Sequence, residues 1–243
     1  MSDPSSAESK LILVTGASRG LGRQIATACA ERGYRLALVA RDETELNELA
    51  ETLRSTHACE VGVFASDLTE SASSARCIAS VQAAMGAVDV LVNNAGIGWY
   101  KPFLEHTPEE HDRMIDINFR SVVQLTHAAL PAMLEQKRGH IINIASDLAQ
   151  RALGNMAVYT ATKHAMRGLS RSLSQEYRTR GVKITQINPG MIDSSFNNSV
   201  EGSLDEFGAL KTKPLADLIV QVMEQPGHQM VDEIEVHAVG QEY

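Results

Sequence analysis

The sequence predicts an α/β fold with a single doubly wound parallel sheet of about seven strands, flanked by helices on both faces. Three observations predict this fold. Short apolar segments alternate with segments of helical period along the chain. A glycine-rich turn joins the first apolar segment to the first helical one. No Pro-, Ser- or Gly-rich linker divides the 243 residues, so they fit one domain.

The expected strands are apolar runs at residues 11–15, 35–40, 60–65, 88–92, 139–145, 182–187 and 231–237. Helical patterns lie between them, at about 20–32, 43–55, 71–85, 108–136, 157–180 and 208–225. The second of these helices shows the signal best, because Leu46, Leu49, Ala50 and Leu53 fall on one apolar stripe.

Composition limits the domain organisation and the partners. Residues 1–9, MSDPSSAES, are polar and predict a flexible tail rather than a signal peptide, which leaves residues 10–243 as the single domain. The net charge of −8 argues against nucleic acid or an anionic membrane as a partner. No apolar run approaches the roughly 20 residues of a membrane-spanning helix.

The cysteines and histidines predict no metal site. Cys29, Cys59 and Cys77 have neither metal-ligand spacing nor an even number, which indicates reduced thiols in a cytoplasmic protein. The eight histidines form no H-x-x-H or H-E-x-x-H pattern.

The glycine-rich turn has the properties of a phosphate-binding loop. Residues 11–22 read LILVTGASRGLG, so Gly16, Gly20 and Gly22 follow an apolar strand and open a helix. Glycines permit a tight turn and let the backbone approach a pyrophosphate, and the helix N-terminus offers free N–H groups to it. The spacing is G-x-x-x-G-x-G, not the commoner G-x-G-x-x-G.

Tyr159 and Lys163 form a second motif, Y-x-x-x-K. Four residues are just over one helical turn, so both side chains leave the same face of the helix expected at 157–180. A cation beside a phenol favours the phenolate and should lower the tyrosine pKa from about 10. Tyr159 is therefore a candidate proton donor or acceptor near neutral pH.

With these two motifs the chain resembles the short-chain dehydrogenase/reductase family, from about Lys10 to about Val236. Further family motifs follow in order: Asp67 in SDLT, Asn93 to Gly96 in NNAG, Asn118 in DINFRS, Ser146 in INIAS and Asn188 to Gly190 in NPG. The resemblance implies a Rossmann-type domain and an NAD(P)-dependent oxidoreductase that interconverts an alcohol and a carbonyl.

The resemblance also implies four catalytic residues. Tyr159 protonates the developing alkoxide, or takes the proton in the reverse reaction. Lys163 lowers the pKa of Tyr159 and binds the nicotinamide ribose. Ser146, at the end of the fifth expected strand, holds the carbonyl oxygen, although a strand-end hydroxyl that caps a turn is the plainer alternative. Asn118 perturbs its helix and holds a water that links Lys163 to solvent.

The charges after the second strand predict NADP(H) as the cofactor. Arg41 at the strand end and Arg19 in the glycine turn are placed to meet a 2′-phosphate. Asp42 is the alternative, as an acceptor for the ribose 2′-OH of NAD(H). With Glu45 it looks instead like a capping box for the next helix.

The full set of expected ligand-binding residues combines the motifs with the resemblance. The cofactor set is Gly16, Ser18, Arg19, Gly20, Leu21, Gly22, Arg41, Asp67, Leu68, Asn94, Ala95, Gly96, Tyr159, Lys163, Pro189, Gly190, Ile192 and Ser194. The substrate set is Asp147, Leu148, Asn155, Met156, Met191 and Phe196, with a substrate cover near 191–213. Ser194 stands where family members often carry Thr.

The substrate is expected to be a small carbonyl or alcohol compound. Two other functions stay open: a nicotinamide-dependent epimerase or dehydratase, and a non-catalytic NADP(H) sensor. The resemblance further implies a homodimer or homotetramer that packs through the helices at 108–136 and 157–180. The apolar faces expected there are Leu125, Ala128, Ala129, Ala165, Leu169 and Leu173.

Overall fold

The computed structural model describes residues 9–70, 72–196, 199–200, 202–204 and 208–241. The expected tail at 1–9 therefore lies outside the described residues except for Ser9. Several positions of the expected cover at 191–213 also lie outside them.

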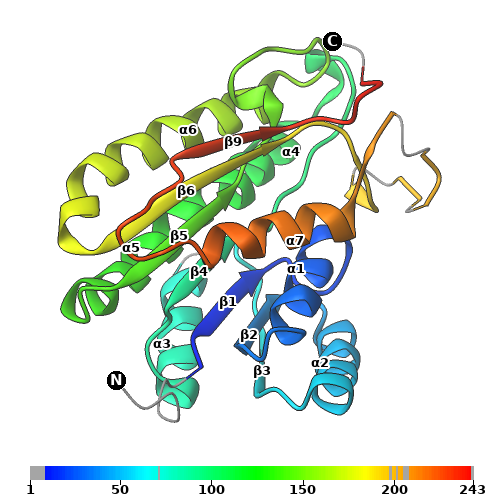
Figure 1. The fold of residues 1–243 in the computed structure, drawn as a ribbon. Coiled ribbons are helices and arrows are strands. Elements are labelled where there is room, and N and C mark those ends of the chain that lie inside the picture. The colour runs from blue at the N-terminus through cyan, green and yellow to red at the C-terminus, as the bar shows by residue number, and fades with distance from the viewer. Residues whose placement is uncertain (1–8, 71, 197–198, 201, 205–207, 242–243) are drawn as a thin grey trace.

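A seven-stranded sheet forms the centre of the described part of the chain (Figure 1). Its strand order is β3-β2-β1-β4-β5-β6-β9, and every neighbouring pair is parallel. The doubly wound, Rossmann-type fold is confirmed. The strands are β1 (Leu11–Thr15), β2 (Arg35–Ala40), β3 (Val61–Ala65), β4 (Val90–Asn93), β5 (Gly139–Ile144), β6 (Val182–Pro189) and β9 (Glu233–Val236).

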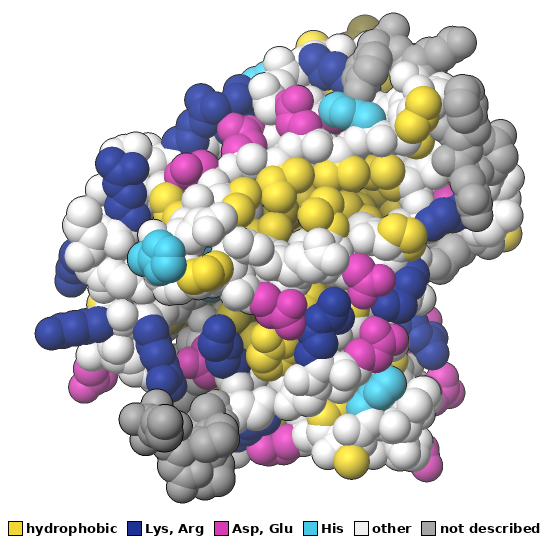
Figure 2. Space-filling view, in the orientation of Figure 1, with side chains coloured by type: hydrophobic (Ala, Val, Ile, Leu, Met, Phe, Trp, Pro, Cys, Tyr) yellow, Lys and Arg dark blue, Asp and Glu magenta, His cyan; other side chains and the backbone are white. Residues whose placement is uncertain are grey.

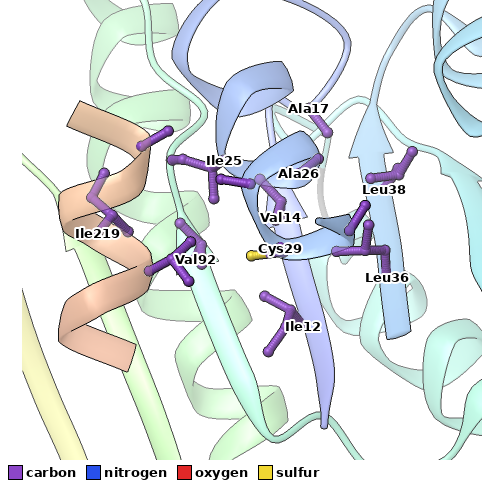
Figure 3. Packing of buried hydrophobic residues seen from close by; sticks show 14 of the residues in the cluster. Ile12, Val14, Ala17, Ile25, Ala26, Cys29, Leu36, Leu38, Val92 and Ile219 are labelled. Atoms are coloured by element: carbon purple, nitrogen blue, oxygen red, sulfur yellow. The ribbon is translucent and has the colours of Figure 1, made fainter. Parts of the chain in front are cut away.

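Helices cover both faces of the sheet, because alternate residues of each strand point to opposite faces. Ile12 and Val14 of β1 belong to one apolar cluster, which contains residues of α1, α2 and α7. Figure 3 shows Ile25 of α1 and Ile219 of α7 among its members. Leu11 and Leu13 belong to the other cluster, which contains residues of α3 and α5. The helices are α1 (Gly20–Ala30), α2 (Glu43–His57), α3 (Ser73–Met85), α4 (Pro108–Ile115), α5 (Ser121–Glu135), α6 (Ala157–Tyr177) and α7 (Thr212–Met223).

The single helix expected at 108–136 is wrong in one respect, because it is interrupted. A π-helical turn, Asp116–Arg120, separates α4 from α5 and contains Asn118. π-turns are frequently found at functional sites. The apolar pattern runs through all three pieces, so periodicity alone predicted one helix.

Short elements complete the chain. Two-residue strands β7 (Ile192–Asp193) and β8 (Leu210–Lys211) pair in parallel, which shortens the helix expected at 208–225. Single 3₁₀ turns lie at Phe103–Glu105, Asp147–Ala149 and Arg178–Arg180. Among the described helices, none is both long and apolar enough to cross a membrane.

The sheet reverses its strand order between β1 and β4. Chain connections leave this point toward opposite sides, which opens a crevice beyond the carboxyl ends of the strands. The glycine turn after β1 and the NNAG segment at the end of β4 both lie there.

Candidate active site

The glycine turn has the backbone geometry that a dinucleotide-binding loop requires. Gly16 and Gly20 have φ of +64° and +54°, in the left-handed region that favours glycine. A Cβ at Gly22 would collide with the carbonyl oxygen of Gly16, so this glycine is needed for close packing. Arg19 precedes α1 without a side-chain cap, and the first turn of α1 has no acidic residue. The N-terminal N–H groups of α1 therefore suit an anionic pyrophosphate.

The loop after β4 is tied to the glycine turn by Thr15. Its Oγ1 accepts hydrogen bonds from the backbone N–H groups of Asn94 (2.9 Å) and Ala95 (3.0 Å). The Asn94 amide donates in return to the Thr15 carbonyl oxygen, at 2.9 Å. A Cβ at Gly96 would lie 3.3 Å from Asn118 Oδ1, so the loop passes directly beside the expected catalytic residues.

Asp42 caps α2. Its Oδ1 accepts a hydrogen bond from the backbone N–H of Glu45 at 3.0 Å. Arg41, at the end of β2, and Arg19, before α1, are both exposed. The geometry thus favours the capping role for Asp42 and leaves the two arginines as exposed cations at this edge of the crevice.

Asp67, after β3, is held in a turn by Thr69. Its Oδ1 accepts from the backbone N–H of Thr69 at 3.0 Å and from the hydroxyl at 2.7 Å. Burial by itself would raise the pKa of Asp67, but these bonds, with the positive charges of Arg41 and Arg113, lower it below its ordinary value. Arg113 was missed from the sequence, because only the fold brings α4 toward the end of β3.

Three expected cofactor residues, Ser18, Leu21 and Leu68, are buried. The Leu21 side chain lies in the cluster with α1, α2 and α7, and the Leu68 side chain lies in the opposite cluster. For the two leucines, only backbone groups remain to contact a nucleotide.

The segment after β6 approaches the glycine turn. Pro189 is the last residue of β6, and Ile192 begins β7. Ser194 is buried, and a Cβ at Gly20 would lie 3.6 Å from its Cβ. The residues expected over the nicotinamide therefore face the loop expected to hold the pyrophosphate.

Tyr159, Lys163 and Ser146 meet in one buried site. Tyr159 and Lys163 lie on α6, and Ser146 follows β5; their exposed fractions are 8%, 4% and 7%. Ser146 Oγ donates to Asp147 Oδ1 at 2.9 Å and accepts the backbone N–H of Leu148 at 3.2 Å, so it also caps the turn that follows. It lies close enough to the Tyr159 hydroxyl to affect its pKa. Lys163 Nζ donates to the Ile144 carbonyl oxygen at 3.0 Å and lies 5.4 Å from the centroid of the Tyr159 ring.

The expectation that the Tyr159 pKa is lowered is wrong for this protein. Burial raises the pKa above its ordinary value of about 10; the neighbouring Ser146 hydroxyl opposes this rise, and the negative charge of Asp147 adds to it. Burial also lowers the pKa of Lys163 to about 8. Tyr159 therefore keeps its proton at neutral pH, which suits a proton donor.

Asn118 holds the loop after β4 to the π-helical turn. Its Oδ1 accepts from the backbone N–H of Ile97, and its Nδ2 donates to the Ile97 carbonyl oxygen, both at 2.8 Å. Nδ2 also lies 3.3 Å from Thr162 Oγ1, on α6. Asn118 is fully buried. It thus joins the loop, the π-turn and the helix that carries Tyr159.

We expect Asn118→Ala to lower the free energy of unfolding by about 2–4 kcal/mol, because it leaves two backbone groups of Ile97 without partners. The measurement is urea unfolding followed by circular dichroism. Asn47→Ala, on the exposed face of α2, is the matched control and should change stability by less than about 0.5 kcal/mol. Equal stability of the two variants would contradict the structural role of Asn118.

Apolar side chains pack around Tyr159. Leu148 and Tyr159 belong to one small cluster, against which Trp99 and Met156 pack. The Phe196 ring lies 5.8 Å from the Tyr159 ring. The structure therefore brings these expected substrate residues to the catalytic group, and adds Trp99.

The other expected substrate residues differ in how exposed their side chains are. Met191 is 54% exposed, and Asn155 is exposed with a φ of +64°. Asp147 is only 6% exposed, and its carboxylate is bonded to Ser146, Arg151 and Gln241. Arg151 and Gln241 were missed from the sequence, since no motif marks a contact that tertiary folding creates. Among the described residues, no group of acidic, histidine or cysteine side chains is arranged to hold a metal ion.

Comparisons with known proteins find relatives among oxidoreductases. The short chain dehydrogenase family profile matches residues 10–204. An uncharacterised oxidoreductase of Staphylococcus epidermidis is 34% identical over 230 residues, which cover 95% of this chain and 97% of the relative.

Two solved structures are similar over nearly the whole chain. An alcohol dehydrogenase from the archaeon Thermococcus sibiricus, complexed with 5-hydroxy-NADP, has a TM-score of 0.92 and 32% identity, covering 97% of this chain and 99% of that one. A metagenomic short-chain oxidoreductase in complex with NADP has a TM-score of 0.83 and 34% identity, covering 96% and 98%. With the family profile matched over most of its length, the chain belongs to the short-chain dehydrogenase/reductase family of oxidoreductases.

Proposed function

We propose that this protein is an NADP(H)-dependent oxidoreductase that interconverts a carbonyl compound and its primary or secondary alcohol. The observation that carries the proposal is the buried group of Tyr159, Ser146 and Lys163 beside the NNAG loop. An acid, a second hydroxyl and a cation are what carbonyl reduction needs around one oxygen atom.

Each of the three side chains has one task in the proposed reaction. Bound NADPH would supply the hydride that reaches the carbonyl carbon. Tyr159 gives its proton to the carbonyl oxygen, and its raised pKa keeps the hydroxyl protonated at neutral pH. Ser146 donates a hydrogen bond to the same oxygen. Lys163, with a pKa of about 8, keeps its charge at pH 7 and is our proposed contact to the nicotinamide ribose.

The described residues fit the cofactor. The uncapped N-terminus of α1 and the positive-φ glycines suit the pyrophosphate, and Arg19 and Arg41 suit a 2′-phosphate. The complexes of the two solved relatives with NADP compounds support this assignment.

The substrate we propose is a small carbonyl compound or the matching alcohol. Leu148, Met156, Trp99 and Phe196 lie around Tyr159 and favour apolar substituents. On the face that carries α7, basic and acidic side chains are interspersed (Figure 2), which supports small-molecule rather than nucleic-acid binding. The three cysteines are free, in keeping with a reducing compartment.

A panel of aldehydes, ketones and alcohols tests the proposal. Oxidation of NADPH at 340 nm with at least one carbonyl compound would support it, with the reverse reaction followed from NADP and the alcohol. A protein that binds NADPH but turns over no compound of the panel would contradict it and favour a sensor.

We further propose that the protein is a homo-oligomer that packs through the expected helical segments 108–136 and 157–180, but not through all of the expected residues. Ala128, Ala165, Leu169 and Leu173 are partly exposed. Leu125 and Ala129 are buried in the core of the protomer, so they cannot face a second subunit. An exposed apolar groove of about 390 Å³ lies between α4, the π-turn and α6. Its lining residues are Phe103, Ile115, Phe119, Ala157, Val158, Ala161, Thr162 and Ala165.

Light scattering at micromolar concentration should give a dimer or a tetramer for the wild-type protein. Ala161→Arg places a charge in this groove and should produce a smaller species, because burial of an unpaired charge opposes association. Ala83→Arg, on the exposed face of α3, is the matched control and should leave the mass unchanged. A monomeric wild-type protein would refute the proposed assembly.

A further inference from the structure

The segment after β9 folds back onto the site through one side chain, Gln241. Its Oε1 accepts a hydrogen bond from the backbone N–H of Met191 at 2.9 Å. Its Nε2 donates to Oδ2 of Asp147 at 3.0 Å. Met191 begins the expected substrate cover, and Asp147 directly follows Ser146. One carboxamide therefore bridges two segments that flank the catalytic group.

The backbone around Gln241 is arranged for this contact. The N–H of Gly190 donates to the Val236 carbonyl oxygen at 2.8 Å, which fixes the end of β6 to the end of β9. A Cβ at Gly190 would collide with the Gln241 side chain, so the glycine leaves room for it. The backbone N–H of Gln241 donates to the carbonyl oxygen of the buried Ala238, at 3.1 Å.

Asp147 connects Gln241 to the catalytic hydroxyl. Its Oδ1 accepts the Ser146 hydroxyl at 2.9 Å, and its Oδ2 accepts Arg151 as well as Gln241. A serine hydroxyl has one proton, so Asp147 and a substrate oxygen compete for it. Donors from Arg151 and Gln241 on Oδ2 make the carboxylate a weaker acceptor toward Ser146.

We propose that Gln241 is a positioning residue for Ser146 and for the start of the substrate cover. Gln241 fixes the Asp147 carboxylate, which orients the Ser146 hydroxyl. It also makes that carboxylate a weaker hydrogen-bond acceptor, so that Ser146 can donate its proton to the substrate oxygen instead. The same carboxamide holds the Met191 backbone. The role of Ser146 rests on the proposed function; the link between Gln241 and Met191 does not.

The test compares Gln241→Leu with Gln225→Leu. Leucine keeps most of the side-chain volume and removes both hydrogen bonds. Gln225, just beyond the end of α7, is the matched control, because its side chain donates to the nearby Gln221 carbonyl oxygen and the substitution leaves its backbone contacts in place. We expect Gln241→Leu to speed hydrogen exchange of the Met191 amide at least about tenfold and to lower kcat/KM for the carbonyl substrate about tenfold. NADPH affinity and thermal stability should stay close to those of Gln225→Leu.

A pH profile distinguishes positioning from packing. Gln241→Glu keeps the side-chain length but places a second carboxylate beside Asp147, whose Oδ2 also faces Arg151 and, at 3.8 Å, His237 Nε2. Repulsion between the two carboxylates raises the pKa of one of them. Its kcat/KM should therefore recover as the pH falls, because the protonated carboxyl can again donate to Asp147. Gln241→Leu has no group to protonate and should show no such recovery.

Each outcome decides a different claim. Unchanged exchange of the Met191 amide in Gln241→Leu would overturn the inference as a whole. Faster exchange with unchanged kcat/KM would overturn the positioning of Ser146. A wild-type protein that reduces no carbonyl compound would defeat the proposed function and, with it, the Ser146 part, while the exchange measurement would still decide the link to Met191.

Discussion

Tyr159→Phe should lower the rate of carbonyl reduction by roughly a hundredfold or more, because it removes the proton donor of the proposed reaction. The substitution deletes one oxygen atom and keeps the ring. The ring at position 159 should therefore keep its contact with Phe196 and its position beside Gly98. NADPH affinity should change little, since Lys163 and the glycine turn are untouched.

The measurement is kcat with NADPH and the best carbonyl compound of the panel, together with NADPH affinity from fluorescence titration. Tyr100→Phe is the matched control: Tyr100 is 57% exposed and should show wild-type kcat. If Tyr159→Phe keeps more than about a tenth of the wild-type rate, another group supplies the proton.

The fold was predictable because the chemistry that defines it is local. The strands expected at 11–15 and 35–40 have the observed bounds, and the other five agree within a few residues. Each is a short apolar run between polar turns, which a parallel sheet buried on both faces requires. The π-turn at Asp116–Arg120 was not predicted, because one wider turn hardly changes the spacing of apolar residues along the helix.

The site was predictable to the extent that it rests on spacing within one element. Tyr159 and Lys163 lie four residues apart on α6 and meet as expected. The direction of the Tyr159 pKa was not predictable in this way. It depends on how deeply the tyrosine is buried and on the charge of Asp147, which the tertiary structure decides.

Contacts that depend on the whole fold carried no sequence signal. Gln241 meets Asp147 across 94 positions of the chain. Two of the six residues expected at the interface, Leu125 and Ala129, were wrong for the same kind of reason, because both are among the most buried residues of α5. An apolar stripe shows that a helix face is buried, but not whether its own core or a second subunit buries it.

NADP(H) should be preferred over NAD(H) by more than about a hundredfold, if Arg19 and Arg41 each contribute a charge-assisted contact of about 1.5–3 kcal/mol to the 2′-phosphate. Both arginines are exposed beside the crevice. Asp42, the alternative partner for a ribose 2′-OH, already accepts the N–H of Glu45. The wild-type measurement is kcat/KM for NADPH and for NADH at a fixed carbonyl substrate concentration.

The double variant Ala40→Asp with Arg41→Ala should reverse this preference. A carboxylate at the end of β2 would accept the 2′-OH of NADH and repel the 2′-phosphate of NADPH, and the loss of Arg41 removes one phosphate contact. kcat with the preferred cofactor should stay near the wild-type value, because Tyr159 is untouched. Arg138→Ala, an exposed arginine just before β5, is the control and should leave the preference unchanged. A wild-type enzyme that used NADH as well as NADPH would contradict the argument, and Asp42 would then be the better candidate for the ribose contact.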